Sequence, residues 1–383
     1  MNAKLTDFRH NLHRIAELSG NESETASALR DRLEDSRPSS LLDGLGGHGI
    51  AALFESDQPG ARVLLRCDMD ALPIDENLRL EYSSKTPGVS HKCGHDGHMA
   101  MMLGLAGRLA ERPLEAGAAI LLFQPAEETG EGARKVLDDP QFEALRPDLA
   151  LALHNLPGFP EGHIVWREGL FALASVGLEA KLQGASSHAA EPEAARSPAR
   201  ALAGIIQEFD DLSDPGAIER GGGILTVIHA RLGTRAFGTT PGDAAIMATL
   251  RSGTKDALEE LKRKALESIA RHAKSDRLDF ESEWVEFFPQ THNDSDLLKE
   301  ALNACRESGL PLVRAESPFR WSEDFGHFCE AMPGALFGIG AGEDHPPLHH
   351  PDYDFPDLVL ETGVDFLEAA LRRLVDQREG SGT

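Results

Sequence analysis

A thiol, several imidazoles and two adjacent carboxylates lie in two short segments of this chain. Residues 90–98 read Ser-His-Lys-Cys-Gly-His-Asp-Gly-His, and residues 124–128 read Gln-Pro-Ala-Glu-Glu. Thiolate, imidazole and carboxylate groups are the usual protein ligands of zinc and similar divalent ions. Each segment adjoins a strongly apolar run, so each is expected at the mouth of a strand or the start of a helix. We therefore predict a metal-dependent active site.

Cys93 and His95 are the first candidate ligands, because a Cys-Gly-His turn lets a thiolate and an imidazole point the same way. His91 and His98 flank the pair and are interpreted as helix-end residues or as supports of the ligands. One alternative is a buried structural cysteine beside solvated histidines. Another is a thiol amidase, in which His95 activates Cys93 as a nucleophile.

Glu127 and Glu128 are adjacent carboxylates that follow an apolar run. Such a pair repels itself unless a cation lies beside it. We predict that Glu128 binds metal and that Glu127 transfers protons, since a buried carboxylate near water activated by a metal is poised as a general base. The alternative is a solvated pair in a loop.

His154 and His349 each follow an apolar run, as expected for residues at the ends of strands. In a chain that already offers thiol and carboxylate ligands, both are predicted to bind metal. His345 and His350 compete with His349 for this role.

Asp68 and Asp70 follow a further apolar run, residues 62–67. An aspartate that accepts a hydrogen bond from a ligating histidine fixes the tautomer of that histidine. We predict this role for Asp70.

The elements that position these residues alternate between strand and helix. Apolar runs predict strands at 62–67, 118–123 and 149–153, and helical spacing predicts helices within 6–35 and 97–110. This alternation predicts an α/β fold with a mainly parallel open sheet flanked by helices. Active sites of such sheets lie beyond the carboxyl ends of the strands, where the polar motifs fall.

The pattern changes near residue 170 to the order β-α-β-β-α-β, which is typical of an α+β ferredoxin-like domain. Its predicted elements are strands at 176–183, 223–231, 244–251 and 279–288 and helices at 197–212 and 255–273. A helix (296–308) and an apolar strand (335–339) then resume the first pattern. We therefore predict a discontinuous catalytic domain, residues 1–170 and 289–383, with an inserted domain at 171–288. The tail after Arg378 is expected to be disordered.

Charge and cysteine content restrict the partners and the compartment. The net charge of −25 argues against nucleic acid and anionic membranes, which would repel the chain. No apolar run approaches the roughly 20 residues of a membrane span, and the first seven residues lack a signal-peptide core. Four scattered cysteines do not make a disulfide framework. We expect a cytoplasmic, reduced protein.

In these motifs the chain resembles a known superfamily of dinuclear metallohydrolases, that of aminoacylases, acetylornithine deacetylases and glutamate carboxypeptidases. It is most similar to the branch of hippurate hydrolases and auxin-conjugate amidohydrolases. The resemblance spans nearly the whole chain. The matching stretches are Arg-Cys-Asp-Met-Asp-Ala-Leu-Pro (66–73), His-Lys-Cys-Gly-His-Asp-Gly-His (91–98), Gln-Pro-Ala-Glu-Glu (124–128), Ser-Glu-Asp-Phe (322–325) and Leu-His-His-Pro (348–351).

The resemblance implies two divalent metal ions per subunit and an assigned role for each site residue. Glu127 would be the general base, and Asp70 would orient the metal site. The cysteine would bridge the two ions, whose identity (zinc, manganese, nickel or cobalt) stays open. The implied ligands are Cys93, His95, Glu128, His154 and His349.

The resemblance also implies that the inserted domain is a lid through which the chain forms a homodimer or a dimer of dimers. His188 would reach into the partner subunit's site and stabilise the oxyanion. Arg251 would receive the substrate's carboxylate, for which a guanidinium fork is suited.

The chain departs from the family pattern at three places. The usual Asn-Val-Ile-Pro of the lid is here Gly-Thr-Thr-Pro (238–241), so an amide that contacts substrate is missing. The usual Pro-Glu near the N-terminus is Ala16-Glu17, and His350 is an extra imidazole after the proposed ligand.

We predict a metal-dependent amidohydrolase that cleaves N-acyl amino acids to a carboxylic acid and a free amino acid. One alternative is a metallo-dipeptidase or carboxypeptidase acting on small peptides. Another is a catalytically silent metal-binding module, against which the presence of Glu127 argues.

Overall fold

The computed structural model describes residues 2–220 and 222–376, which divide into two compact units. Unit 1 comprises the described residues up to Phe171, then Thr291–Pro318 and those from Asp324 onward. Unit 2 comprises Ala172–Gln290 and Phe319–Glu323. The predicted disorder after Arg378 lies outside the described residues.

Residues 319–323, predicted within the second part of the catalytic domain, group with unit 2 in the structure. This segment belongs to unit 2 because its main chain and side chains bind there: the Leu173 amide donates to the Phe319 carbonyl at 3.1 Å, and Arg251 donates to the Ser322 hydroxyl at 2.8 Å. Sequence patterning gave no sign of it, since five residues in a loop carry no periodicity.

Unit 1 is built on an eight-stranded sheet with the order β1-β2-β4-β3-β5-β14-β6-β13. Its four central strands are mutually parallel, as predicted: β3 (Arg62–Asp68), β4 (Ala118–Gln124), β5 (Leu149–Pro157) and β14 (Gly334–Gly342). They are buried almost throughout, which explains their near-continuous apolar sequences. The flanking strands are β1 (Ser40–Leu45), β2 (Gly49–Glu55), β6 (Ile164–Trp166) and β13 (Leu312–Arg314).

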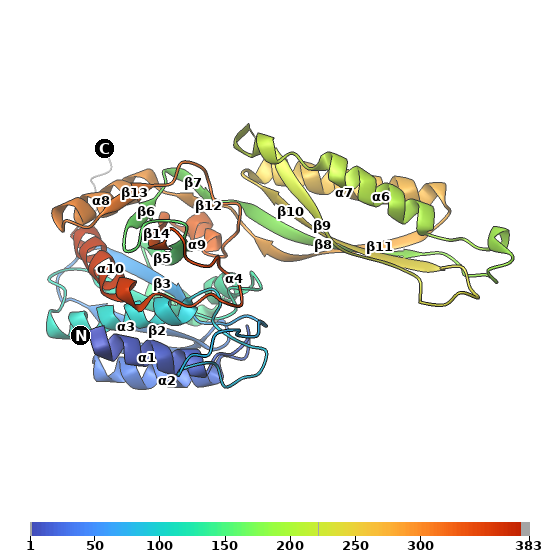
Figure 1. Ribbon diagram of the computed structural model, residues 1–383. Coiled ribbons are helices and arrows are strands. Elements are labelled where there is room, and N and C mark those ends of the chain that lie inside the picture. The colour runs from blue at the N-terminus through green and yellow to red at the C-terminus, as the bar shows by residue number, and fades with distance from the viewer. Residues whose placement is uncertain (1, 221, 377–383) are drawn as a thin grey trace. The chain divides into compact units, whose positions relative to one another are not determined.

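Helices pack on this sheet and carry part of the site. The predicted helical stretch 6–35 is two helices, α1 (Asn2–Arg14) and α2 (Ser23–Asp35), separated by a turn that contains Gly20 at φ +80°. Helix α3 (His95–Glu111) packs against α1 and against α10 (Leu360–Val375), which in turn packs on α8 (Ser295–Glu307), as Figure 1 shows. Shorter helices are α4 (Gly132–Leu137), α5 (Pro140–Leu145) and α9 (Gly326–Ala331). Strands β7 (Gly169–Ala172) and β12 (Thr291–Asn293) pair as a small second sheet.

Unit 2 has the predicted β-α-β-β-α-β order. Its antiparallel sheet has the order β11-β8-β10-β9, and helices α6 and α7 cover one face of it (Figure 1). Alternate residues of β10 face those helices and are buried. The elements are β8 (Ala174–Gln183), α6 (Ala199–Leu212), β9 (Gly223–Leu232), β10 (Asp243–Ser252), α7 (Lys255–Ser275) and β11 (Asp279–Phe288), with short 3-10 turns at Pro192–Ala194 and Pro215–Arg220.

A membrane-crossing helix is not found in the described part of the chain, where every helix is too short or too polar for that role.

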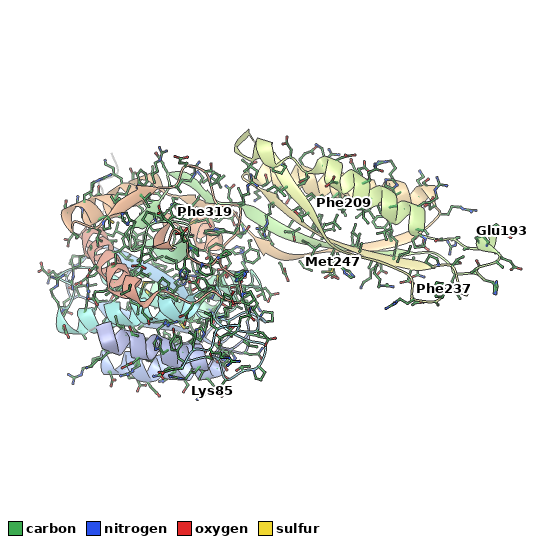
Figure 2. The ribbon with its side chains drawn as sticks, viewed as in Figure 1. Lys85, Glu193, Phe209, Phe237, Met247 and Phe319 are labelled. Carbon is green, nitrogen blue, oxygen red and sulfur yellow. The ribbon has the colours of Figure 1, made fainter. Side chains whose placement is uncertain are left out.

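The core of unit 2 supplies a test of this packing. Phe209 on α6 is fully buried against the sheet, whereas Met247 on β10 lies on the opposite face and is only partly buried (Figure 2). We expect Phe209→Ala to lower the free energy of unfolding by about 3–5 kcal/mol, because it leaves a cavity. Met247→Ala should cost less than about 1 kcal/mol. Urea denaturation followed by the fluorescence of Trp284, which packs on this core, measures both; equal losses would contradict the assignment of the buried face.

Candidate metal centre

The candidate ligands and their supports come from the carboxyl ends of the central strands and from the start of α3. Asp68 and Asp70 lie at or just beyond the end of β3, and Glu127 and Glu128 follow β4. His349 lies in the loop after β14.

His154 lies inside β5, three residues before its end, because this strand is longer than its apolar run. Gly94, at φ +90°, ends the preceding loop so that α3 begins at His95.

The structure connects the five predicted ligands in one cluster of unit 1. The Cys93 Sγ atom lies 3.6 Å from His154 Nε2, and the ligand atoms of Cys93, Glu128 and His349 lie within 4.8 Å of one another. Glu128 Oε1 lies 3.8 Å from His95 Nε2 and 3.7 Å from His349 Nε2. One carboxylate oxygen therefore faces two imidazole nitrogens at distances that leave room for ions.

The two histidines that competed with His349 are directed elsewhere. His345 Nε2 lies 2.7 Å from the carbonyl oxygen of Asp354, and His350 Nδ1 lies 3.8 Å from a carboxylate oxygen of Asp352. His349 has a main chain at φ +65°, and its amide donates to the Lys92 carbonyl at 2.8 Å. This bond ties the loop of His349 to the segment of Cys93.

Two buried polar atoms at the centre of the cluster indicate that it fits a cation. His95 Nε2 and Glu128 Oε1 have no hydrogen-bond partner among the described residues, although both are buried. An unpaired buried polar atom costs roughly 1–3 kcal/mol, so such atoms are rare in folded proteins. A metal ion coordinated by both atoms would remove this cost.

The electrostatics of the cluster also favour a positive ion. Burial, with the neighbouring charges of Asp70 and Asp68, raises the pKa of Glu128. Burial lowers the pKa of His95, but Asp68, Asp70 and Glu128 outweigh it and the net shift is upward. Burial holds the pKa of His154 well below its ordinary value, so this imidazole is neutral and able to act as a ligand.

Asp70 contacts two of the candidate ligands, His95 and Glu128, through both its main-chain carbonyl and its carboxylate. His95 Nδ1 lies 2.9 Å from the Asp70 carbonyl oxygen and 3.4 Å from the carboxylate oxygen Oδ1. A hydrogen bond from Nδ1 leaves the lone pair of Nε2 directed at Glu128. The other carboxylate oxygen accepts hydrogen bonds from Ser19 Oγ at 2.6 Å and from the Glu128 amide at 3.0 Å.

Both ring nitrogens of His98 already have partners, which fits the prediction that this residue supports the ligands. Nδ1 lies 2.6 Å from Asp68 Oδ1, and Nε2 lies within hydrogen-bond distance of both the side-chain oxygen and the main-chain amide of Asn155. Arg66 donates to the other Asp68 oxygen at 2.9 Å. Sequence reasoning missed Asn155, whose only signal is its position directly after His154.

A second buried network holds the segment of the general-base candidate. Arg66 donates to Asp324 at 2.7 Å and to Gln124 at 2.8 Å, and Gln124 donates to Asp324 at 2.8 Å. The Asp324 amide lies 3.5 Å from Glu127 Oε1, and the ligand atoms of His95, Glu127 and Glu128 lie within 4.8 Å of one another. Glu127 therefore lies beside the ligand cluster and is itself buried.

Helix α1 contributes a buried imidazole, His13, that sequence reasoning missed. Its two ring nitrogens lie 2.8 Å from Asp96 and 2.8 Å from Glu76. Lys92 Nζ donates to the same Glu76 oxygen at 2.8 Å. Burial lowers the pKa of His13, but the two carboxylates outweigh it and raise the pKa to about 9. A charged His13 thus links α1 to the segment that carries Cys93 and His95.

His91 does not end a helix. It is buried with neither ring nitrogen hydrogen-bonded among the described residues, and burial lowers its pKa to about 4.

The remaining predicted residues, His188 and Arg251, belong to unit 2. His188 is exposed, and its Nδ1 accepts the Ala190 amide proton at 3.1 Å. Arg251 lies near the end of β10, on the less buried face of the sheet. Its NH1 group donates to Ser322 Oγ at 2.8 Å and to the Arg320 carbonyl at 3.3 Å. Burial lowers the pKa of Arg251.

A mainly parallel α/β sheet that gathers thiol, imidazole and carboxylate ligands at the carboxyl ends of its strands is typical of metallohydrolases. The sequence profile of Peptidase family M20/M25/M40 matches residues 64–373, and the chain belongs to this family.

Three relatives illustrate the similarity. An N-acetyl-L-cysteine deacetylase of Bacillus subtilis (strain 168) is 29% identical over 99% of this chain and 90% of its own. The IAA-amino acid hydrolase ILR1-like 5 of Arabidopsis thaliana is 31% identical over 97% and 87%. A crystal structure from Bacillus subtilis, described as a dinuclear metal binding peptidase of the M20 family, superposes with a TM-score of 0.82 at 27% identity and covers 98% of this chain and 99% of its own.

His13 predicts a pH dependence of stability. Its pKa is raised from an ordinary 6.5 to about 9, so its contribution is complete below pH 6.5 and is lost as the pH rises through 9. We expect this loss to be about 3 kcal/mol in the free energy of unfolding. Urea denaturation at several pH values should show a steeper decline for the wild type than for His13→Gln. Parallel curves would contradict a charged His13.

Proposed function

We propose that this protein is a metal-dependent amidohydrolase that cleaves the amide bond of N-acyl amino acids. The observation that carries the proposal is Glu127, a buried carboxylate beside the ligand cluster that the five-ligand set does not need. A protein that only stored or sensed metal would have no use for it. The relatives named as an N-acetyl-L-cysteine deacetylase and an IAA-amino acid hydrolase support the substrate class.

We infer that the cluster would hold two divalent ions, with Cys93 among their ligands. The dinuclear metal binding relative supports this number, and a thiolate favours soft ions such as zinc. Bound metal supplies Lewis acidity, which polarises the scissile carbonyl and lowers the pKa of water from about 15.7 towards ~7. The proposed ligands are Cys93, His95, Glu128, His154 and His349.

Glu127 is proposed to take the proton from the attacking water and to return it to the nitrogen of the leaving amine. Burial suits both steps, because a carboxylate away from bulk water is a stronger base than a solvated one. The Asp324 amide, 3.5 Å from Glu127 Oε1, would orient the carboxylate. Asp70 would act indirectly by orienting His95 and Glu128.

Unit 2 is proposed to act as a lid and as the dimerisation domain of a homodimer or dimer of dimers. Arg251 would bind the substrate's α-carboxylate, with its guanidinium oriented by Ser322 and the Arg320 carbonyl. His188 would stabilise the oxyanion of the tetrahedral intermediate in the partner subunit's site. The Cys93 thiol must stay reduced to bind metal, which supports a cytoplasmic enzyme.

A dipeptidase or carboxypeptidase acting on small peptides is the second candidate, and the peptidase description of the dinuclear relative favours it. The two activities share every residue named above. Parallel assays with hippurate, N-acetyl amino acids and dipeptides separate them. A higher kcat/KM for hippurate or an N-acetyl amino acid would favour the amidohydrolase, and a higher kcat/KM for a dipeptide would favour the peptidase.

Removal of the proposed base tests the function. Glu127→Gln keeps the shape of the side chain and removes its basicity, so kcat for hippurate or an N-acetyl amino acid should fall by about 10²–10⁴-fold. Metal content, measured by elemental analysis after loading with zinc or manganese, should stay at the wild-type value. Near wild-type turnover by the variant would show that another group is the base.

Chelation provides the control. Dialysis of the wild type against a chelator should abolish activity, and adding zinc or manganese should restore it. Activity that survives complete metal removal would favour a thiol amidase in which Cys93 is the nucleophile.

Arg251 predicts a change in substrate affinity. Arg251→Ala removes a charged hydrogen bond to the carboxylate, worth roughly 1.5–3 kcal/mol, so KM for an N-acyl amino acid should rise about 10–100-fold. The matched control is the same substrate with its carboxylate replaced by a carboxamide, for which wild type and variant should behave alike. An equal loss on both substrates would assign Arg251 a structural role instead.

A further inference from the structure

The turn that delivers Glu127 and Glu128 begins at a residue in a conformation that disfavours side chains. Ala126 has φ +52°, in the left-handed region that non-glycine residues rarely adopt. The turn is tight: a Cβ atom on Gly132 would lie 1.7 Å from the Pro125 carbonyl oxygen. Local bonds close it, since the Ala126 carbonyl accepts from the Gly132 amide at 3.0 Å and from Thr129 Oγ1 at 3.2 Å.

A distant carboxylate binds the main chain at this residue. Glu22 precedes α2 and is fully buried, and its Oε1 atom accepts the Ala126 amide proton at 2.8 Å and the Gly20 amide proton at 2.8 Å. The first of these bonds joins residues that are 104 positions apart in the sequence. It connects the turn between α1 and α2 to the residue immediately before Glu127.

The cost of burying Glu22 suggests that this contact is more than incidental. Its second oxygen, Oε2, is buried without a hydrogen-bond partner among the described residues. Burial raises the pKa of Glu22, and Asp70 adds to this, although three backbone amides act in the opposite direction. Burial of the Glu22 carboxyl is not needed to cap α2, because the half-buried Glu17 already accepts the amide protons of Glu24 and Thr25.

From these contacts we propose that Glu22 is a positioning residue for the catalytic turn: its carboxyl oxygen holds Ala126 in the left-handed conformation that aims Glu127 at the reaction centre. Asp70 fixes the other end of the pair through the Glu128 amide at 3.0 Å. Two buried carboxyl groups thus bracket Glu127 from both sides along the main chain. This inference rests on the proposed role of Glu127 as the base.

The test compares Glu22→Ala with Glu22→Gln, because a glutamine oxygen can still accept both amide protons. In metal-free protein, hydrogen exchange of the 124–132 segment should be roughly 10-fold faster in Glu22→Ala than in the wild type. In metal-loaded protein, kcat should fall by up to about 100-fold, as expected for a misplaced catalytic group, with KM little changed. Glu22→Gln should stay close to the wild type in both measurements.

A second-site change makes the test specific. Glycine adopts the left-handed conformation without steric cost, so adding Ala126→Gly to Glu22→Ala should recover a large part of kcat. Glu17→Ala is the matched control. It removes a nearby carboxylate that accepts hydrogen bonds from residues 23–25 and not from Ala126. It should lower the melting temperature without changing exchange at 124–132.

Three outcomes would overturn the inference: unchanged exchange at 124–132 in Glu22→Ala, equal damage in Glu22→Gln, or no recovery on adding Ala126→Gly. Failure of the proposed function looks different. If Glu127→Gln remains active, the base is misassigned, yet the exchange measurements still report whether Glu22 holds the turn.

Discussion

The structure of the site depends on one electrostatic constraint: several carboxylates are buried together and must be neutralised there. Asp68 and Asp70 are almost completely inaccessible to solvent, and Glu127 is buried beside them. Arg66 provides part of the compensating charge through its ion pair with Asp68 at 2.9 Å. His95 Nε2 and Glu128 Oε1 are buried without a hydrogen-bond partner among the described residues, and a cation coordinated by both atoms would complete the balance. The fold therefore concentrates negative charge at the candidate metal centre, and this concentration costs folding free energy that the binding of a cation would recover.

A second layer of buried charge holds the loops that carry the ligands. Asp96, directly after His95, binds both Arg9 and His13 of α1. Lys92 donates to Glu76 and to the carbonyl of Tyr353, which follows the loop of His349. Segments from the N-terminus, from the middle of the chain and from the C-terminal part thus meet at α3. Positions of ligands that are distant in the sequence are fixed by these contacts and not by any local propensity.

The parts of the fold that could be predicted from sequence are those where one local signal suffices. The central strands are continuous apolar runs because both of their faces are covered, and the metal motifs follow those runs directly. Edge strands such as β1, which is largely exposed, have no such signal and were not predicted. The position of the turn between α1 and α2, which contains Gly20, was also not predicted.

Within the candidate site, residue types suggest ligands from the sequence alone, whereas the residues that hold those ligands in place give no such sign. Cys93, His95 and Glu128 belong to residue types that mark metal sites by themselves. Asn155, His13 and Glu22 act through hydrogen bonds to residues 57, 83 and 104 positions away, and only the fold reveals such bonds. The choice of His349 over its neighbours likewise required the contact of its amide with the Lys92 carbonyl.

The departure from the family pattern at Gly238 can be interpreted in the same physical terms. A Cβ atom there would meet nothing within 4 Å, and the backbone does not have a positive φ, so packing within unit 2 does not require glycine. The main chain still pairs with the His188 segment: the Gly238 carbonyl accepts the Ala189 amide proton at 3.0 Å, and Thr239 bridges to His188. The adjacent Phe237 is fully exposed at the end of this hairpin (Figure 2). The substitution therefore removes a side-chain amide and leaves the backbone arrangement around His188 intact. A difference of this kind alters what the loop can contact, not how the loop folds.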